Sequence, residues 1–189
     1  VMFYATASTG YRPGGNNRRP GVLPFKSDKL YNYELGWKTH FGRIYFNGAA
    51  FYEKWKDLQF GLVPTGTNGV TFTYNAGNAR IYGVEAEASA KFGGLSLSAS
   101  GTYVDAKLTT DLCRPDPVTK NLVCDGTPAT IAAYKGTRLP VMPKFKGSAT
   151  ARYEFPLGSM DGFVQGSANH QGGTRSFLTD SDFAAVGST

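Results

Sequence analysis

The sequence predicts an all-β fold, an antiparallel up-and-down transmembrane β-barrel of which this chain supplies about seven strands. Three observations predict it. Apolar and polar residues alternate over many short segments, the connections between segments are alternately short and long, and no segment approaches the roughly 20 apolar residues of a membrane helix. Charged residues make up 18% of the chain, below the roughly 25% typical of soluble domains, and composition alone leaves open both a soluble β protein and a membrane β protein.

Alternation with a period of two residues locates the strands. In residues 95–103, leucine, alanine, glycine and tyrosine alternate with serine and threonine, so one face is apolar and the other polar. The same pattern predicts strands over 1–11, 31–41, 82–92 and 143–155, and a weaker one over 162–171. Residues 44–60 are ambiguous, because Phe51 shares a face with Asn47 and Glu53. We expect a bulge there, or a strand that leaves the membrane.

The connections decide whether the apolar face meets lipid or a protein core. Short turns are expected at 41–43, 92–94 and 157–161, and long loops at 12–29, 61–73 and 107–140. A soluble sandwich or barrel is the alternative, but it has no reason to gather its long loops at one end. Outer-membrane barrels do so, with tight periplasmic turns and long extracellular loops.

The alternation then assigns side chains to two faces of the sheet. We expect these residues to face lipid: Leu35, Trp37, Leu97, Ala99, Ala149 and Ala151. The charged residues of the opposite face should point into the lumen, where water can solvate them: Glu34, Lys38, Glu85, Glu87, Lys146 and Arg152.

Four segments resemble the barrel of TonB-dependent outer-membrane receptors. They are GYRPGGN at 10–16, YNYELGWKT at 31–39, NAGNARIYGVEAEA at 75–88 and LPVMPKFKGSATARYEF at 139–155. The resemblance implies a barrel of about 22 strands around a plugged lumen, in the bacterial outer membrane. The family's plug domain, its TonB-contacting segment and its final barrel strands have no counterpart in these residues. We therefore expect 1–189 to be part of one barrel domain in a larger protein.

The resemblance also implies a function, which is active uptake of a scarce substrate such as an iron–siderophore complex, with TonB as the energy-transducing partner. Two alternatives stay open: a passive porin, and a non-transport barrel that binds a surface partner through its loops. The sequence contains no Gly-x-Ser-x-Gly elbow, His-Glu-x-x-His motif or phosphate-binding loop, so we expect neither enzymatic activity nor a cofactor.

Positive charge gathers in two of the long loops. Residues 12–29 carry a net charge of +4 and residues 107–140 a net charge of +2, which together equal the +6 of the chain. Such a rim would attract an anionic ligand, or else contact lipopolysaccharide phosphates. Nucleic acid is a poor candidate, because no recognised nucleic-acid-binding fold accompanies the charge. The candidate ligand-binding residues are Arg12, Arg18, Arg19, Arg138, Tyr11 and Tyr134.

Both cysteines lie in the longest loop, Cys113 and Cys124. Two cysteines this close in an irregular segment, in an oxidising compartment, predict a disulfide that restricts the loop. Two reduced thiols are the alternative. Metal binding is poorly supported because no histidine is near.

Overall fold

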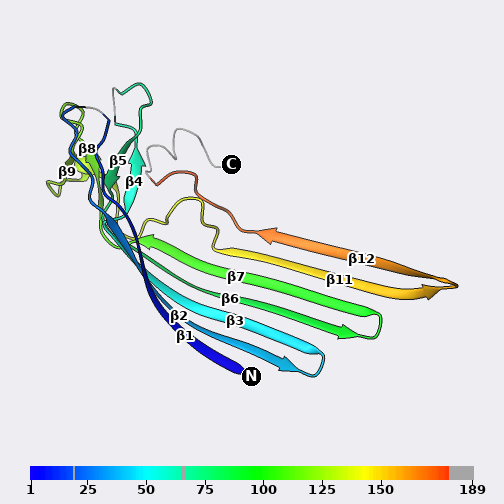
Figure 1. Cartoon of the computed structure of the whole chain (residues 1–189). Helices are drawn as coiled ribbons and strands as arrows, with labels where there is room; N and C mark the ends of the chain where they lie inside the picture. Colours follow the sequence, from blue (N-terminus) through cyan, green and yellow to red (C-terminus); the bar gives the residue numbers. More distant parts are fainter. Residues whose placement is uncertain (19, 65–66, 179–189) are drawn as a thin grey trace.

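The chain folds around one seven-stranded antiparallel sheet in the order β1-β2-β3-β6-β7-β11-β12 (Figure 1). The computed structural model describes residues 1–18, 20–64 and 67–178. In the sheet, β1 and β12 are the two edges and do not pair with one another, so the sheet is not closed. Its strands are β1 (Met2–Arg12), β2 (Asp28–Phe41), β3 (Ile44–Lys56), β6 (Ala79–Phe92), β7 (Leu95–Leu108), β11 (Phe145–Leu157) and β12 (Met160–Gln171).

Three two-residue turns join neighbouring strands at the right-hand end of the sheet in Figure 1. Each turn begins with a glycine of positive φ, namely Gly42, Gly93 and Gly158, with φ of 60°, 59° and 67°. Such backbone angles match the right-handed twist of the flanking strands, and other residues adopt them at a cost. The short turns predicted from the sequence are confirmed.

All seven predicted strands are present, and most are longer than the alternation indicated. Of the two explanations offered for residues 44–60, a bulge is absent from residues 44–55, since β3 pairs there with β2 and β6 in an unbroken register. The other explanation, a strand that leaves the membrane, stays a prediction. The ambiguity arose because Phe51 lies on the polar face. Its ring covers Gly83 of the neighbouring strand, where an added Cβ would lie 2.7 Å from the ring. A glycine on the next strand thus gives an aromatic ring room on a polar surface.

The register assigns every strand residue to one of two faces. Leu35, Ala50 and Val84 lie in one row, and Ala88, Ala99 and Ala149 lie in another on the same face, which we call the outer face. All six residues predicted to face lipid belong to it. The six charged residues predicted for the lumen share the opposite, inner face.

The outer face has an apolar band of the height that an outer membrane requires. Tyr82 and Phe92 limit it along β6 and lie ten residues apart. This separation is about 34 Å along a strand, and a tilt near 40° reduces it to about 26 Å, close to the roughly 25 Å band of outer-membrane barrels. Aromatic residues at both limits correspond to the two girdles of such barrels.

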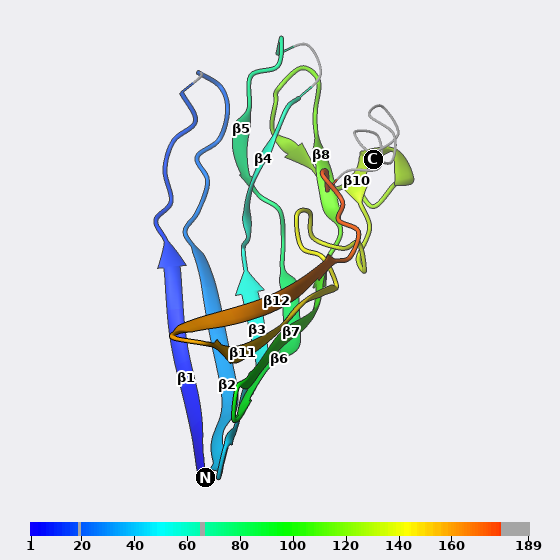
Figure 2. The same ribbon diagram turned by 90° about the vertical axis from the view of Figure 1, so that its right-hand side faces the viewer.

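The opposite end of the molecule carries the long connections, which are folded rather than irregular (Figure 2). One connection forms the hairpin of β4 (Gln59–Leu62) and β5 (Phe72–Asn75). Another forms a small sheet of β8 (Leu112–Pro115), β9 (Leu122–Val123) and β10 (Ile131–Ala133), with a 3₁₀ turn, η1, at Pro128–Thr130. No helix in the described part of the chain is long and apolar enough to cross a membrane.

A hydrophobic core lies beneath these connections. It joins the hairpin and the small sheet to the upper ends of β6 and β7, and its buried members are Leu58, Leu62, Phe72, Tyr74, Ala76, Ala79, Ile81, Ala106, Leu108, Leu112, Ala132, Ala133, Leu139 and Leu178. The sheet itself needs no such core because lipid covers its outer face. Burial of apolar area therefore concentrates at this end, which we call the rim, and gives the rim a defined shape.

Candidate functional site

The rim is organised around one buried carboxylate. Asp28, at the start of β2, is 1% exposed, and its Oδ2 accepts hydrogen bonds from Arg12 Nε (2.9 Å) and Trp55 Nε1 (3.0 Å). Arg12 Nη2 also pairs with Oδ2, and the backbone N–H of Gln59 donates to it at 3.1 Å. Burial alone would raise the pKa of Asp28, but these donors outweigh it and hold the pKa below its ordinary value.

Three asparagine side chains, which we call the amide clamps, join the rim segments to one another. Asn17 donates to the carbonyl of Thr73 and accepts from its N–H, at 3.0 and 2.9 Å. Asn75 engages both backbone groups of Lys26 in the same way, at 3.0 and 2.8 Å.

The third clamp, Asn121, reaches the first long loop from the small sheet. Its Oδ1 accepts from the N–H of Leu23 at 2.9 Å, and its Nδ2 donates to the carbonyl of Gly21 at 3.3 Å. Each clamp satisfies backbone groups that have no strand partner, as buried or crowded backbone requires. The loops are thereby fixed as one body.

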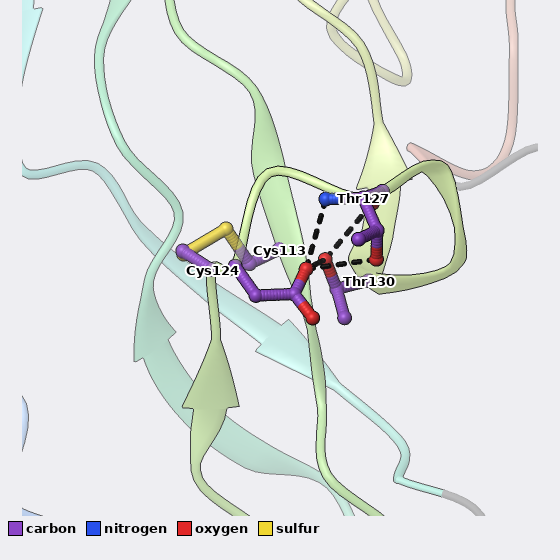
Figure 3. Close-up of a disulfide and its surroundings, with 5 residues drawn as sticks. Cys113, Cys124, Thr127 and Thr130 are labelled. Carbon is purple, nitrogen blue, oxygen red and sulfur yellow. Dashed lines mark hydrogen bonds between the residues drawn. A yellow bond between two sulfur atoms is a disulfide. The ribbon is translucent and has the colours of Figure 1, made fainter.

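Cys113 and Cys124 form a disulfide that joins β8 to the residue after β9, with their Cα atoms 5.4 Å apart (Figure 3). Beside it, Asp125 Oδ1 accepts hydrogen bonds from the hydroxyl of Thr130 (2.6 Å) and from the N–H and hydroxyl of Thr127 (2.9 and 2.8 Å). These hydrogen bonds hold the pKa of Asp125 below its ordinary value, and the bond from Thr130 has the largest effect. The bridge and the carboxylate thus fix the path from β9 to η1.

Replacing both cysteines with serine is expected to loosen this loop without unfolding the sheet. Closing an 11-residue loop stabilises the folded state by about 3 kcal/mol, because the open loop has more conformational freedom when unfolded. Hydrogen exchange at the amides of Arg114 and Val123 should therefore accelerate by about a hundredfold. Equal exchange in the variant and the parent, with the parent's bridge intact, would contradict this expectation.

The structure does not bring the predicted ligand-binding residues into one cluster. Arg12 lies on the inner face, where its guanidinium donates hydrogen bonds to the carboxylate of Asp28. Its Nη2 also donates to the carbonyl oxygen of Gln59 at 2.9 Å. Tyr11 lies on the outer face, 73% exposed, in register with Lys29. Successive residues of a strand point to opposite faces, so Tyr11 and Arg12 cannot line one pocket.

The remaining candidates are distributed over two loops. Arg18 is exposed in the first long loop, and Arg19 lies outside the described residues. Tyr134 is half exposed just after β10. Arg138 is half-buried, and its Nη2 donates to the carbonyl of Met142 at 3.1 Å. Of the described candidates, Arg18 is the cation most available to a ligand.

Sequence reasoning missed the residues that shape the rim, namely Asp28 and the amide clamps. A signal existed for Asp28, because the segment 12–29 contains five basic residues and Asp28 is its only acidic one. A single carboxylate in such a segment is a natural ion-pair partner. No comparable signal existed for the clamps, since asparagine in a loop ordinarily indicates a turn.

The antiparallel strands form a wall with an apolar outer face and a polar inner face. Short turns lie at one end of this wall, and a folded, basic rim lies at the other. These features define the chain as part of an outer-membrane β-barrel. Residues 1–188 match the family model described as "TonB dependent receptor-like, beta-barrel". The chain belongs to the TonB-dependent receptor family and is located in the bacterial outer membrane.

Among characterised relatives, the pesticin receptor of Yersinia enterocolitica is 29% identical over 147 residues, covering 75% of this chain and 19% of the receptor. The metal-pseudopaline receptor CntO of Pseudomonas aeruginosa is 28% identical over 187 residues, covering 97% of this chain and 23% of the receptor. The chain thus spans about a fifth of the length of these relatives.

Solved structures share the fold. The ferric yersiniabactin uptake receptor FyuA from Yersinia pestis superposes with a TM-score of 0.62 at 24% identity, over 88% of this chain and 23% of the receptor. The FrpB iron transporter from Neisseria meningitidis gives a TM-score of 0.55 at 16% identity, over 87% of this chain and 24% of the transporter.

Proposed function

We propose that the protein containing this chain takes up an anionic metal chelate of the ferric siderophore type across the outer membrane. TonB would supply the energy for this uptake. The observation that carries the proposal is the net positive charge of the long loops at the rim, +3 in residues 12–28 and +1 in residues 108–140. Two relatives support the substrate class by their names, one as a receptor for ferric yersiniabactin and the other for metal-pseudopaline.

The rim suits this function because its charge is presented on a fixed scaffold. A concentrated positive field raises the local concentration of an anion and the rate at which it is captured. Exposed arginine can then hold a carboxylate through two parallel hydrogen bonds. The buried Asp28 and the amide clamps order the loops before the ligand arrives, so that binding costs less conformational entropy.

Neutralising Arg18 and Arg19 together, as R18Q/R19Q in the full-length receptor, should weaken binding of a carboxylate-bearing ferric siderophore. The reason is the loss of two charges, each of which contributes about 0.5–1 kcal/mol to attraction at an exposed site. We expect roughly a tenfold rise in Kd and a smaller dependence of Kd on salt. Titration at two ionic strengths measures both.

A charge-matched control is Arg43→Gln with Lys91→Gln, near the short turns at the other end of the sheet. This control should bind as the parent does. An unchanged affinity and salt slope in R18Q/R19Q would refute an electrostatic role for the first loop. Growth on the chelate as sole iron source, with and without TonB, distinguishes active uptake from a passive pore, since a porin would support growth in both strains.

A further inference from the structure

Five basic side chains gather on the outer face of the sheet, just above the upper aromatic girdle. The register places Lys54, Arg80 and Lys107 side by side in one row across β3, β6 and β7. One row above, Lys29 of β2 lies directly opposite Lys56 of β3. We call these five residues the basic belt. All five are at positions whose side chains share the face of Leu35 and Val84.

The basic belt has little counter-charge within the protein. Like charges directly opposite one another across two strands are destabilising, and the belt contains three such pairs, Lys29–Lys56, Lys54–Arg80 and Arg80–Lys107. An acidic residue lies one row below, where Asp105 is opposite Tyr82, and its carboxylate pairs with Lys107 at 2.9 Å. Within residues 1–18, 20–64 and 67–178, the other four belt residues have no ion-pair partner.

Aromatic rings hold two of the belt cations in place. The guanidinium of Arg80 lies 5.1 Å from the ring centre of Tyr82, and Lys56 Nζ lies 5.5 Å from that of Tyr31. The Nε of Arg80 is buried and, in the described structure, has no hydrogen-bond acceptor. A guanidinium stacked on a ring is oriented in advance, and its fork of donors suits the oxygens of a phosphate.

The position of the basic belt identifies the kind of anion. One row below it, Tyr33, Tyr52 and Tyr82 lie side by side. Such a tyrosine row marks the boundary between hydrocarbon and head groups. The row that contains Arg80 lies two residues further out, about 7 Å along the strand, which is the level of the lipid head groups. Below the tyrosines the outer face is apolar, with Leu35, Ala50 and Val84.

We propose that the basic belt binds the phosphate groups of a phosphorylated glycolipid of the outer leaflet, whose acyl chains lie against the apolar face below. A lipid meets both requirements of this surface, a negative head group at the level of Arg80 and hydrocarbon beneath the tyrosine row. A soluble chelate meets only the first. The belt also lies on the face opposite Arg12 and Asp28, so it is separate from the rim surface proposed for uptake.

The test uses the full-length receptor in phosphatidylcholine nanodiscs that contain either diphosphorylated lipid A or the same lipid without phosphates. Native mass spectrometry counts bound lipid A as its fraction is raised. The parent should bind the phosphorylated form selectively. In K54Q/R80Q the affinity should fall about 25-fold, since a basic residue near an anionic lipid surface strengthens binding about fivefold.

Two further variants separate charge from folding. K54R/R80K keeps both charges and should retain selective binding, although lysine in place of Arg80 lacks the forked donors of a guanidinium. K38Q/K146Q removes two charges from the inner face and should bind as the parent does. Equal binding of the two lipids by the parent would overturn the proposal. The proposal would also be overturned if K38Q/K146Q lost as much affinity for phosphorylated lipid A as K54Q/R80Q does. A loss of ferric siderophore binding in K54Q/R80Q, with lipid binding intact, would overturn it as well.

Discussion

Alanine in place of Asp28 is expected to destabilise the rim by roughly 3 kcal/mol. The substitution removes the one acceptor shared by Arg12, Trp55 and Gln59, and each buried donor left without a partner costs about 1–3 kcal/mol. Arg12 is half exposed and can turn to water, so the larger share should come from the indole and the backbone N–H. Hydrogen exchange at the Gln59 amide should accelerate about a hundredfold.

Asparagine at position 28 is the matched control, because it keeps the shape and an acceptor oxygen while removing the charge. It should lose about half as much stability. The lowered pKa of Asp28 also predicts a pH dependence. Its contribution is complete above the ordinary carboxyl pKa of about 4, and it is lost as the pH falls from there through the lowered value. Protection of the Gln59 amide that stays constant from pH 7 to pH 2 in the parent would contradict this role.

Arginine in place of Ala149 is expected to lower the free energy of unfolding by roughly 2–4 kcal/mol, since a charge on the lipid face near the midplane carries about this cost. Ala149 is exposed on the outer face, in one row with Ala88, Ala99 and Ala168. Denaturant titration of the full-length receptor, refolded in phospholipid vesicles, measures the change.

Arginine at the next residue, Thr150, is the control for this prediction. Its side chain points to the inner face, where its hydroxyl lies 3.0 Å from that of Ser167. A charge there can be solvated, so the expected loss is about 1 kcal/mol, mainly that of one hydrogen bond. Equal losses at Ala149 and Thr150 would mean that the two faces of β11 are not lipid and lumen.

The sheet could be predicted from the sequence because lipid imposes a simple rule on it. Each strand must hydrogen-bond to a neighbour, and one face must be apolar, so the pattern of β7 is visible in its own residues, 95–108. The short turns are equally local, with glycine as the residue that accepts positive φ. β3 was harder, since Phe51 on a polar face makes sense only with Gly83, which belongs to another strand.

The rim could not be predicted in the same way, because its decisive contacts are long-range. Asn121 and Leu23 are 98 residues apart in the chain, and Asn17 and Thr73 are 56 apart. Nothing in the neighbourhood of either asparagine marks its partner. Charge led to Arg12 and aromatic character to Tyr11 as candidates for one site, whereas strand alternation places them on opposite faces.

The amide clamps have a consequence for exchanging loops between receptors of different specificity. Asn17 satisfies both backbone groups of Thr73, and Asn121 satisfies the N–H of Leu23. A graft that replaces residues 13–27 alone would remove Asn17 and leave the hairpin at Thr73 without a partner, while Asn121 would meet a foreign backbone. The loops are therefore a single transferable module, and a chimaera should carry over residues 13–27, 57–78 and 109–144 together.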